Sequence, residues 1–211
     1  ASMGAVSLPL YIFKPSVTLD IIENEGCSMF IGAPVHLTAM MQDPSFKDRD
    51  LSALKCLVVG GSNPPVELIK QFSLEFQADV INGYGMTETC GLSCTALPTD
   101  PPELKAIAGL PLPGVSLRVV DENYELVKHD LPGELLYKGP GLMEGYGNLP
   151  DGTSGINDDG WFPTGDLATM NSNGYINIVG RSKEMIIRGG ENLYPIEIEN
   201  YLIEHPGVLE V

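Results

Sequence analysis

LKCLVVGGSNPPVELIKQFSLEFQADVINGYG, residues 54–85, contains the pattern from which the fold class follows. It opens with an apolar run that ends in two glycines and closes with a second apolar run, DVINGYG. Between the runs, two prolines precede a segment whose apolar residues recur at helical spacing. A strand, a helix and another strand in this rhythm predict a parallel sheet covered by helices, because a parallel connection needs a crossover.

The same alternation extends towards the N-terminus. We expect helices in KPSVTLDIIENEG (14–26) and PVHLTAMMQD (34–43), and a strand in SMFIG (28–32). The apolar segment AVSLPLYIF (5–13) is expected to be extended. We therefore predict that residues 1–113 form the α/β part of a larger N-terminal domain, and that this part is incomplete at its start.

The pattern changes beyond residue 113, where strand signals follow one another without helices between them. The strands are expected in SLRVVD (116–121), GELLYKG (133–139), WFPTGDLATM (161–170) and YINIVG (175–180). Residues 114–180 are therefore predicted to form a mostly antiparallel β subdomain, a small twisted sheet or an open barrel. We interpret residues 181–211 as a hinge and the start of a truncated C-terminal domain, since one helix, PIEIENYLIEH, cannot form a core alone.

Composition excludes several classes of function. The 211 residues carry a formal charge of −16, which gives no electrostatic support for nucleic-acid binding. We expect no transmembrane segment and a cytoplasmic location, because no apolar run reaches membrane-spanning length and no signal peptide is recognisable. The four cysteines, Cys27, Cys56, Cys90 and Cys94, have no second ligand pair at zinc spacing, so we expect buried free thiols.

The run INGYGMTETCG (81–91) resembles a dinucleotide-binding fingerprint only in part. Gly83 and Gly85 supply the first two glycines of G-x-G-x-x-G, but Glu88 stands at the third. No acidic residue ends a suitably spaced second strand either. A dinucleotide-dependent oxidoreductase is therefore a disfavoured alternative.

The residues of this run suit a different nucleotide chemistry. Tyr84, between two glycines, offers an unobstructed ring face for a purine, and Thr87 offers a hydroxyl to a phosphate oxygen. Glu88 offers a hard oxygen ligand of the kind that magnesium takes together with phosphates and water. The alternative is a turn that opens a helix, with Thr87 as its cap.

Three further clusters carry chemistry-bearing residues. GGSNPP (60–65) would let a planar ligand lie against bare backbone, although a tight strand-to-helix turn explains it too. In GWFPTGD (160–166), the Asp166 carboxylate could accept both hydroxyls of a ribose, and the alternative is a turn aspartate. GRSKE (180–184) places Arg181 where it could reach a ribose or a phosphate, unless the segment is a solvated hairpin.

Together and in this order, GGSNPP, GYGMTE, GWFPTGD and GRSKEMIIRGGENLYPIEIE resemble the adenylate-forming (AMP-binding) superfamily over essentially the whole chain. The last motif is most similar to the acyl-CoA synthetase and aryl-CoA ligase branch. The resemblance implies a two-step reaction with ATP, Mg²⁺ and coenzyme A. A fatty or aromatic carboxylic acid attacks the α-phosphorus of ATP, which gives an acyl-adenylate and pyrophosphate, and the thiol then displaces AMP.

The resemblance also implies roles for individual residues. Tyr84 would stack on the adenine, Asp166 would bind the ribose hydroxyls and Arg181 would lie nearby. The implied nucleotide and acyl contacts are Gly60, Gly61, Ser62, Gly83, Tyr84, Gly85, Asp166 and Arg181.

A second group of roles concerns the phosphates and the moving parts. Thr87 would contact the α-phosphate, Glu88 would hold the magnesium ion, and Lys183 would be the hinge residue. Gly190 and Glu191 would belong to the loop that approaches for the thioester step. His36 could line the acyl pocket, or it could be a structural histidine.

Two segments of the family pattern are not found in the sequence. Nothing before Gly60 resembles the phosphate loop, which is rich in Ser, Thr and Gly, and the family's C-terminal lysine is not found before Val211. Since losing one preorganised donor typically costs about a hundredfold to a thousandfold in rate, we expect this fragment to be inactive or weakly active. A non-catalytic module of the same fold, which binds an adenine nucleotide or a partner, is the alternative.

Overall fold

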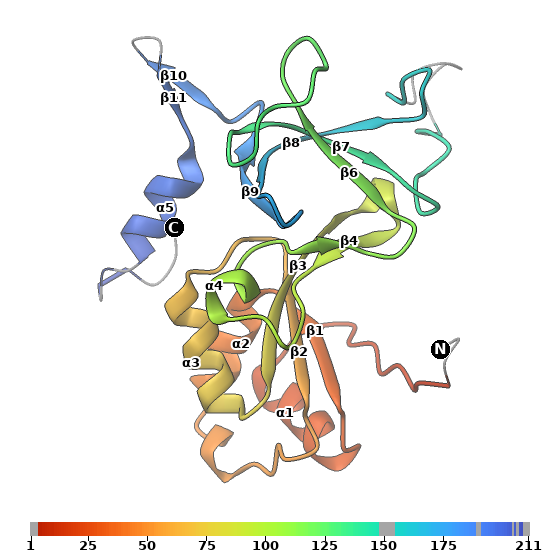
Figure 1. The fold of residues 1–211 in the computed structure, drawn as a ribbon. Helices are drawn as coiled ribbons and strands as arrows, with labels where there is room; N and C mark the ends of the chain where they lie inside the picture. The colour runs from red at the N-terminus through yellow and green to blue at the C-terminus, as the bar shows by residue number, and fades with distance from the viewer. Residues whose placement is uncertain (1–3, 148–154, 189–190, 204, 206, 209–211) are drawn as a thin grey trace.

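The protein, in a computed structural model, forms two larger sheets and a two-stranded one, with helices on one side of the first (Figure 1). The structure describes residues 4–147, 155–188, 191–203, 205 and 207–208. A five-stranded sheet has the order β1-β2-β3-β4-β5, a four-stranded sheet has the order β6-β7-β8-β9, and β10 pairs with β11. The predicted class, an α/β part followed by an antiparallel β part and a further helix, is confirmed.

The five-stranded sheet is mixed. Its strands are β1 (Met29–Gly32), β2 (Cys56–Gly60), β3 (Asp79–Met86), β4 (Gly91–Thr95) and β5 (Leu110–Pro111). β1, β2 and β3 are parallel, as predicted, whereas β4 and β5 are antiparallel additions that the sequence analysis did not anticipate. The reversal arises in a 3₁₀ turn, Thr87–Thr89, followed by Cys90 at φ 56°, because so short a connection permits only antiparallel pairing.

The helices of this part are α1 (Pro15–Asn24), α2 (Pro34–Met41), α3 (Val66–Phe76) and the short α4 (Pro102–Lys105). The three long helices were predicted, and α4 was not. Ile69, Phe72 and Phe76 of α3 are buried against the sheet at the predicted helical spacing. The apolar segment 5–13 forms no strand, and Tyr11 is 99% exposed.

The second sheet is antiparallel throughout, as predicted. It consists of β6 (Ser116–Val120), β7 (Gly133–Lys138), β8 (Phe162–Met170) and β9 (Ile176–Arg181). The C-terminal part holds β10 (Ile186–Arg188), β11 (Glu191–Leu193) and the predicted helix α5 (Pro195–Ile203), which contacts β9. The domain boundaries at residues 113 and 180 stay predictions.

The two sheets share a core where β3 and β4 meet the second sheet. Cys94 of β4 and Ala108 belong to the same buried cluster as Leu135 and Ile176, and Tyr84 packs against it. A backbone bridge between Gly109 and Ile176 adds to this contact. The second sheet therefore packs against the antiparallel extension of the first sheet.

The cysteines are free but not all buried. Cys94 is buried and burial raises the pKa of its thiol to about 12, whereas Cys27 and Cys56 are partly buried. The prediction of burial is wrong for Cys90, which lies at the exposed turn between β3 and β4. Among the described residues, no helix is long and apolar enough to cross a membrane.

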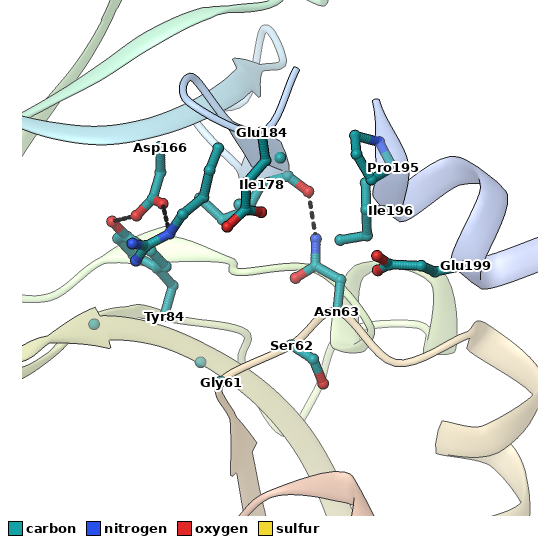
Figure 2. A pocket seen from close by; sticks show the side chains of 14 residues that line it. Gly61, Ser62, Asn63, Tyr84, Asp166, Ile178, Glu184, Pro195, Ile196 and Glu199 are labelled. Carbon is teal, nitrogen blue, oxygen red and sulfur yellow. Dashed lines mark hydrogen bonds and ion pairs between the residues drawn. The ribbon is translucent and has the colours of Figure 1, made fainter. Parts of the chain in front are cut away.

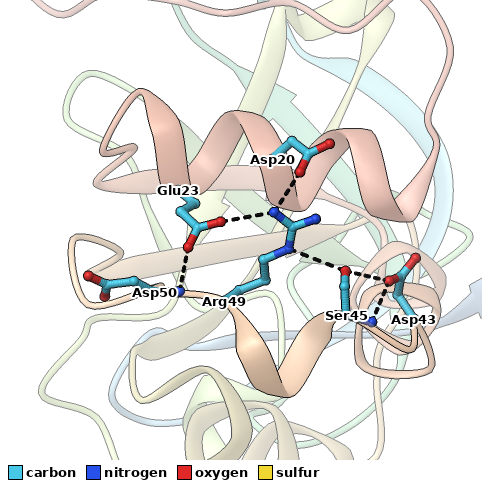
Figure 3. A network of polar contacts seen from close by, with 6 residues as sticks. All are labelled: Asp20, Glu23, Asp43, Ser45, Arg49 and Asp50. Atoms are coloured by element: carbon cyan, nitrogen blue, oxygen red, sulfur yellow. Dashed lines mark hydrogen bonds and ion pairs between the residues drawn. The ribbon is translucent and has the colours of Figure 1, made fainter.

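Arg49 ties α1 to the segment that follows α2 (Figure 3). Its Nη1 contacts Asp20 Oδ1 at 2.5 Å and Glu23 Oε2 at 2.9 Å, and its Nε donates to Ser45 Oγ at 3.2 Å. The Asp50 N–H donates to Glu23 Oε1 at 2.9 Å. The hydrogen bond from the Asp50 backbone and the Arg49 guanidinium lower the pKa of Glu23.

A lowered pKa in the folded state predicts a pH-dependent contribution to stability. Since folded Glu23 holds its proton less tightly than the unfolded chain does, the stabilisation is present above the unfolded pKa and is lost as the pH falls through the folded one. Glu23→Gln should therefore lower the urea midpoint at about pH 7, and the difference should shrink towards about pH 3.

The matched control is Glu122→Gln, which makes the same change at an exposed turn residue. A difference between Glu23→Gln and the control that stayed constant across the pH range would contradict the role assigned to the Glu23 charge.

Candidate functional site

A cleft of about 320 Å³ lies where the two sheets and α5 face one another (Figure 2). Its size falls within the range of about 300–1,000 Å³ that is usual for small-molecule sites. Three segments far apart in the sequence form its walls: the ends of β2 and β3, the strands β8 and β9, and the start of α5. The lining residues are Gly61, Ser62, Asn63, Gly83, Tyr84, Gly85, Asp166, Ile178, Gly180, Arg181, Glu184, Pro195, Ile196 and Glu199.

A buried carboxylate stands at one end of the cleft. Asp166 is 3% exposed, and it accepts a hydrogen bond of 2.5 Å at Oδ2 from the Tyr84 phenol. Its Oδ1 lies 3.0 Å from Arg181 Nε, and the two residues are also paired in the register of β8 and β9. Figure 2 shows Tyr84 and Asp166 pointing towards each other from the two sheets.

The Tyr84 phenol serves this carboxylate as a donor. Burial raises the pKa of Tyr84 far above its usual value, and the hydrogen bond to Asp166 raises it further. The phenol therefore stays protonated across the physiological range, and the proton lies between the two oxygens. Asp166 in turn is fixed by its neighbours, because its own N–H donates to Thr164 Oγ1 at 3.1 Å and Thr164 donates to the Leu135 carbonyl at 2.8 Å.

Gly85 lets β4 approach β3 closely enough to hold Tyr84 in place. A Cβ at Gly85 would lie 1.8 Å from the Gly91 carbonyl oxygen, which is backbone and cannot move aside as a side chain can. The pairing register also shifts between Tyr84 and Gly85. Gly85 is therefore required for the close pairing of β3 and β4, in addition to any effect on access to the Tyr84 ring.

The structure brings together seven of the residues singled out from the sequence. The cleft is lined by Gly61, Ser62, Gly83, Tyr84, Gly85, Asp166 and Arg181. Gly60, Thr87, Glu88 and Lys183 are not among its lining residues. Gly190 lies outside the described residues, and Glu191 is described only as part of β11.

Glu88 lies in the turn after β3 and contacts the segment that follows β7. Its Oε1 accepts a hydrogen bond of 2.8 Å from Tyr146, which raises the pKa of that phenol, and its carbonyl accepts from the Met143 N–H at 2.8 Å. Among the described residues, no group of three or more His, Cys, Asp or Glu could hold a metal ion. A single carboxylate still fits magnesium, which usually takes one or two carboxylates and completes its shell with phosphates and water.

The sequence analysis missed half of the cleft. Asn63, Ile178, Gly180, Glu184, Pro195, Ile196 and Glu199 line it without having been predicted to do so. Signals were available for some of them, since Asn63 lies in GGSNPP (60–65), and Gly180 and Glu184 lie in GRSKE (180–184), both of which the sequence had singled out. His36 lies elsewhere: its Nδ1 accepts from the Ala33 N–H at 3.0 Å and its ring contacts Phe13, which favours the structural interpretation.

Comparison with known proteins identifies the family. The profile described as "AMP-binding enzyme" matches residues 4–147, more than half of the chain. The chain belongs to the AMP-binding enzyme family. The resemblance to adenylate-forming enzymes, and to their acyl-CoA and aryl-CoA ligase branch, is thereby confirmed.

Individual relatives of this AMP-binding family member have related activities. The chain is 37% identical over 210 residues to an indoleacetate–CoA ligase of Aromatoleum aromaticum, which covers 100% of the chain and 41% of that ligase. Among solved structures, O-succinylbenzoate coenzyme A synthetase (MenE) of Bacillus subtilis, in complex with ATP and a magnesium ion, is similar with a TM-score of 0.83 and 30% identity. That match covers 94% of this chain and 41% of the synthetase.

The amide bond synthetase McbA of Marinactinospora thermotolerans is also similar, with a TM-score of 0.85 and 28% identity over 95% of this chain and 42% of McbA. The chain thus spans less than half the length of the relatives that it matches.

Gly85→Ala should destabilise the protein, because the added methyl group meets backbone on β4. We expect a loss of more than about 1 kcal/mol in the free energy of unfolding, measured by urea denaturation. Gly147→Ala is the matched control, since a Cβ there has no heavy atom within 4 Å. Equal stability of the two variants would show that β4 is not pressed against β3.

Tyr84→Phe removes the phenolic hydroxyl and keeps the aromatic ring. Hydrogen bonds to charged groups contribute about 1.5–3 kcal/mol, so we expect a loss of that order in the free energy of unfolding. Tyr146→Phe removes an exposed phenolic hydroxyl that also donates to a carboxylate, and it should lower the free energy of unfolding much less. Equal losses would mean that burial of Asp166 does not strengthen its bond to Tyr84.

Proposed function

We propose that the chain forms the adenosine-binding part of an ATP-dependent ligase that activates carboxylic acids as acyl-adenylates. The observation that carries the proposal is the convergence of Tyr84, Asp166 and Arg181 at one cleft, although Tyr84 and Asp166 are 82 positions apart in the sequence. Family membership supports the reaction class.

Asp166 is proposed to bind the ribose diol. A carboxylate offers about four lone-pair sites, of which the Tyr84 phenol and the Arg181 guanidinium take one each. The remaining sites suit the two ribose hydroxyls, and charge-assisted hydrogen bonds of this kind are stronger than neutral ones. Tyr84 and Arg181 would then hold the carboxylate in the orientation that the sugar requires.

The adenine is proposed to lie between the Tyr84 ring and the Gly60, Gly61 and Ser62 backbone. Gly61 and Ser62 line the cleft and are exposed to it, so a planar base can approach their backbone closely. Gly83 and Gly85 flank the ring without side chains that would cover it.

Thr87 and Glu88 are proposed to serve the phosphates. Thr87 is exposed and Glu88 partly exposed in the turn beyond Tyr84, so both remain accessible to a bound nucleotide. Magnesium would supply positive charge to the phosphates when bound, and Glu88 would be its protein ligand. Glu88 is already oriented by Tyr146, at 2.8 Å.

The second half-reaction is proposed to be acyl transfer to coenzyme A. The names of the relatives, which include an indoleacetate–CoA ligase, feruloyl-CoA synthases and medium-chain acyl-CoA ligases, support this acceptor and a fatty or aromatic acid as substrate. Lys183 would be the hinge for the domain movement between the half-reactions, and Gly190 and Glu191 would approach with the moving part. We keep a cytoplasmic location as a prediction.

Nucleotide binding tests the proposal directly. We expect the chain to bind AMP at one site, and Asp166→Asn to weaken that binding by at least about tenfold, as measured by calorimetric titration. Asp158→Asn, at an exposed position that precedes the same strand, should leave the affinity unchanged. Equal affinity in the wild type and Asp166→Asn would contradict the proposed ribose contact.

The chain alone is proposed to be inactive or weakly active, since neither the phosphate loop nor the C-terminal lysine of the family is found in its sequence. Pyrophosphate release from ATP and magnesium, with a panel of carboxylic acids, should stay far below that of a complete relative. Comparable turnover would overturn this expectation and leave the family assignment intact.

A further inference from the structure

A chain of side-chain amides links the two walls of the cleft. Asn82 of β3 is 1% exposed, and its Nδ2 donates to Asn63 Oδ1 at 3.1 Å and to the Ala106 carbonyl at 3.0 Å. Asn63 Nδ2 donates in turn to the Ile178 carbonyl at 2.6 Å and to Asn177 Oδ1 at 3.1 Å. Figure 2 shows the bond from Asn63 to Ile178 spanning the gap between the two walls.

The orientations of the Asn82 and Asn63 amides are determined by backbone groups. Asn82 Oδ1 accepts the Gly83 N–H at 2.9 Å, so its nitrogen must face Asn63. At the other end the Ile178 carbonyl can only accept, so Asn63 must present its nitrogen there and its oxygen to Asn82. Flipping either amide would place like groups against each other, and the chain therefore has one consistent arrangement.

The amide chain joins the two walls of the cleft, and the proposed nucleotide site requires a definite distance between these walls. Asn63 follows Gly61 and Ser62, and Asn82 precedes Gly83 and Tyr84, on one wall. Ile178 lies on β9, two and three residues before Gly180 and Arg181 of the other wall. The bond between Asn63 and Ile178 connects positions 115 residues apart.

We propose that Asn63 is a positioning residue that sets the width of the cleft by fastening β9 to the loop after β2. It acts through β9 on Arg181, and through Arg181 on Asp166, to which the guanidinium is bonded at 3.0 Å. The expected effect of Asn63 on nucleotide affinity rests on the proposed function. The attachment of β9 by Asn63 does not depend on that function.

Two substitutions at Asn63 remove the fastening in different ways. Asn63→Asp keeps the size and the acceptor for Asn82, but it sets a carboxylate against the Ile178 carbonyl, which has no proton to offer. Asn63→Ala removes the side-chain hydrogen bonds to β9 without adding charge. Asn123→Asp, at an exposed turn, is the control for the change in charge.

The first measurement is amide hydrogen exchange across residues 176–181 in the protein without nucleotide. We expect both Asn63 variants to speed exchange in β9 by about tenfold or more, while β6 and β7 and the Asn123→Asp control stay unchanged. Unchanged exchange in β9 would overturn the proposal, whatever the nucleotide affinity.

The second measurement is AMP affinity, corrected for the folded fraction of each variant. We expect both Asn63 variants to bind AMP about tenfold more weakly than the wild type. Weaker binding with unchanged exchange in β9 would make Asn63 a direct ligand contact and sink the positioning role. If the wild type bound no AMP, the proposed function would fail, and the exchange comparison would still decide whether Asn63 holds β9.

Discussion

The buried carboxylate of Asp166 is the constraint around which the rest of the structure is arranged. A carboxylate that is 3% exposed is costly unless partners satisfy it, and its partners come from two strands, one in each sheet. Tyr84 supplies a proton from β3, Arg181 a guanidinium from β9, and β8 carries the acid itself. A polar contact between the two sheets is therefore also the proposed recognition site for the sugar of a nucleotide.

Two further features of the structure surround that contact. Gly85 allows β4 to approach β3 and continue the sheet towards the second core, where Cys94 is packed. The amides of Asn82 and Asn63 link the two walls of the cleft, and backbone groups determine which atom donates in each of these hydrogen bonds. In both features the residue lies close to a polar backbone group of another segment, so each depends on how the neighbouring strands are placed.

The charge distribution bears on how an anionic ligand would be held. Glu184 and Glu199 line the cleft together with Asp166, and among the described lining residues Arg181 carries the only positive charge. Phosphates entering such a site would need further compensation, since like charges in a partly desolvated cleft repel one another. A divalent cation accompanying the nucleotide, with Glu88 nearby, is consistent with this balance.

Local patterns in the sequence were sufficient for α1, α2, α3 and α5, for the parallel strands and for the four strands of the second sheet, because each follows from apolar spacing and from proline or glycine at its ends. The reversal after β3 was not readable, since it depends on Cys90 adopting a left-handed conformation that its residue type does not favour. The motifs also indicated that Tyr84, Asp166 and Arg181 share one ligand. Which residues meet was decided only in three dimensions: Asn63 bonds to Ile178, and Glu88 bonds to Tyr146. Contacts between such distant segments depend on sheet order and register, which hydrophobic periodicity does not encode.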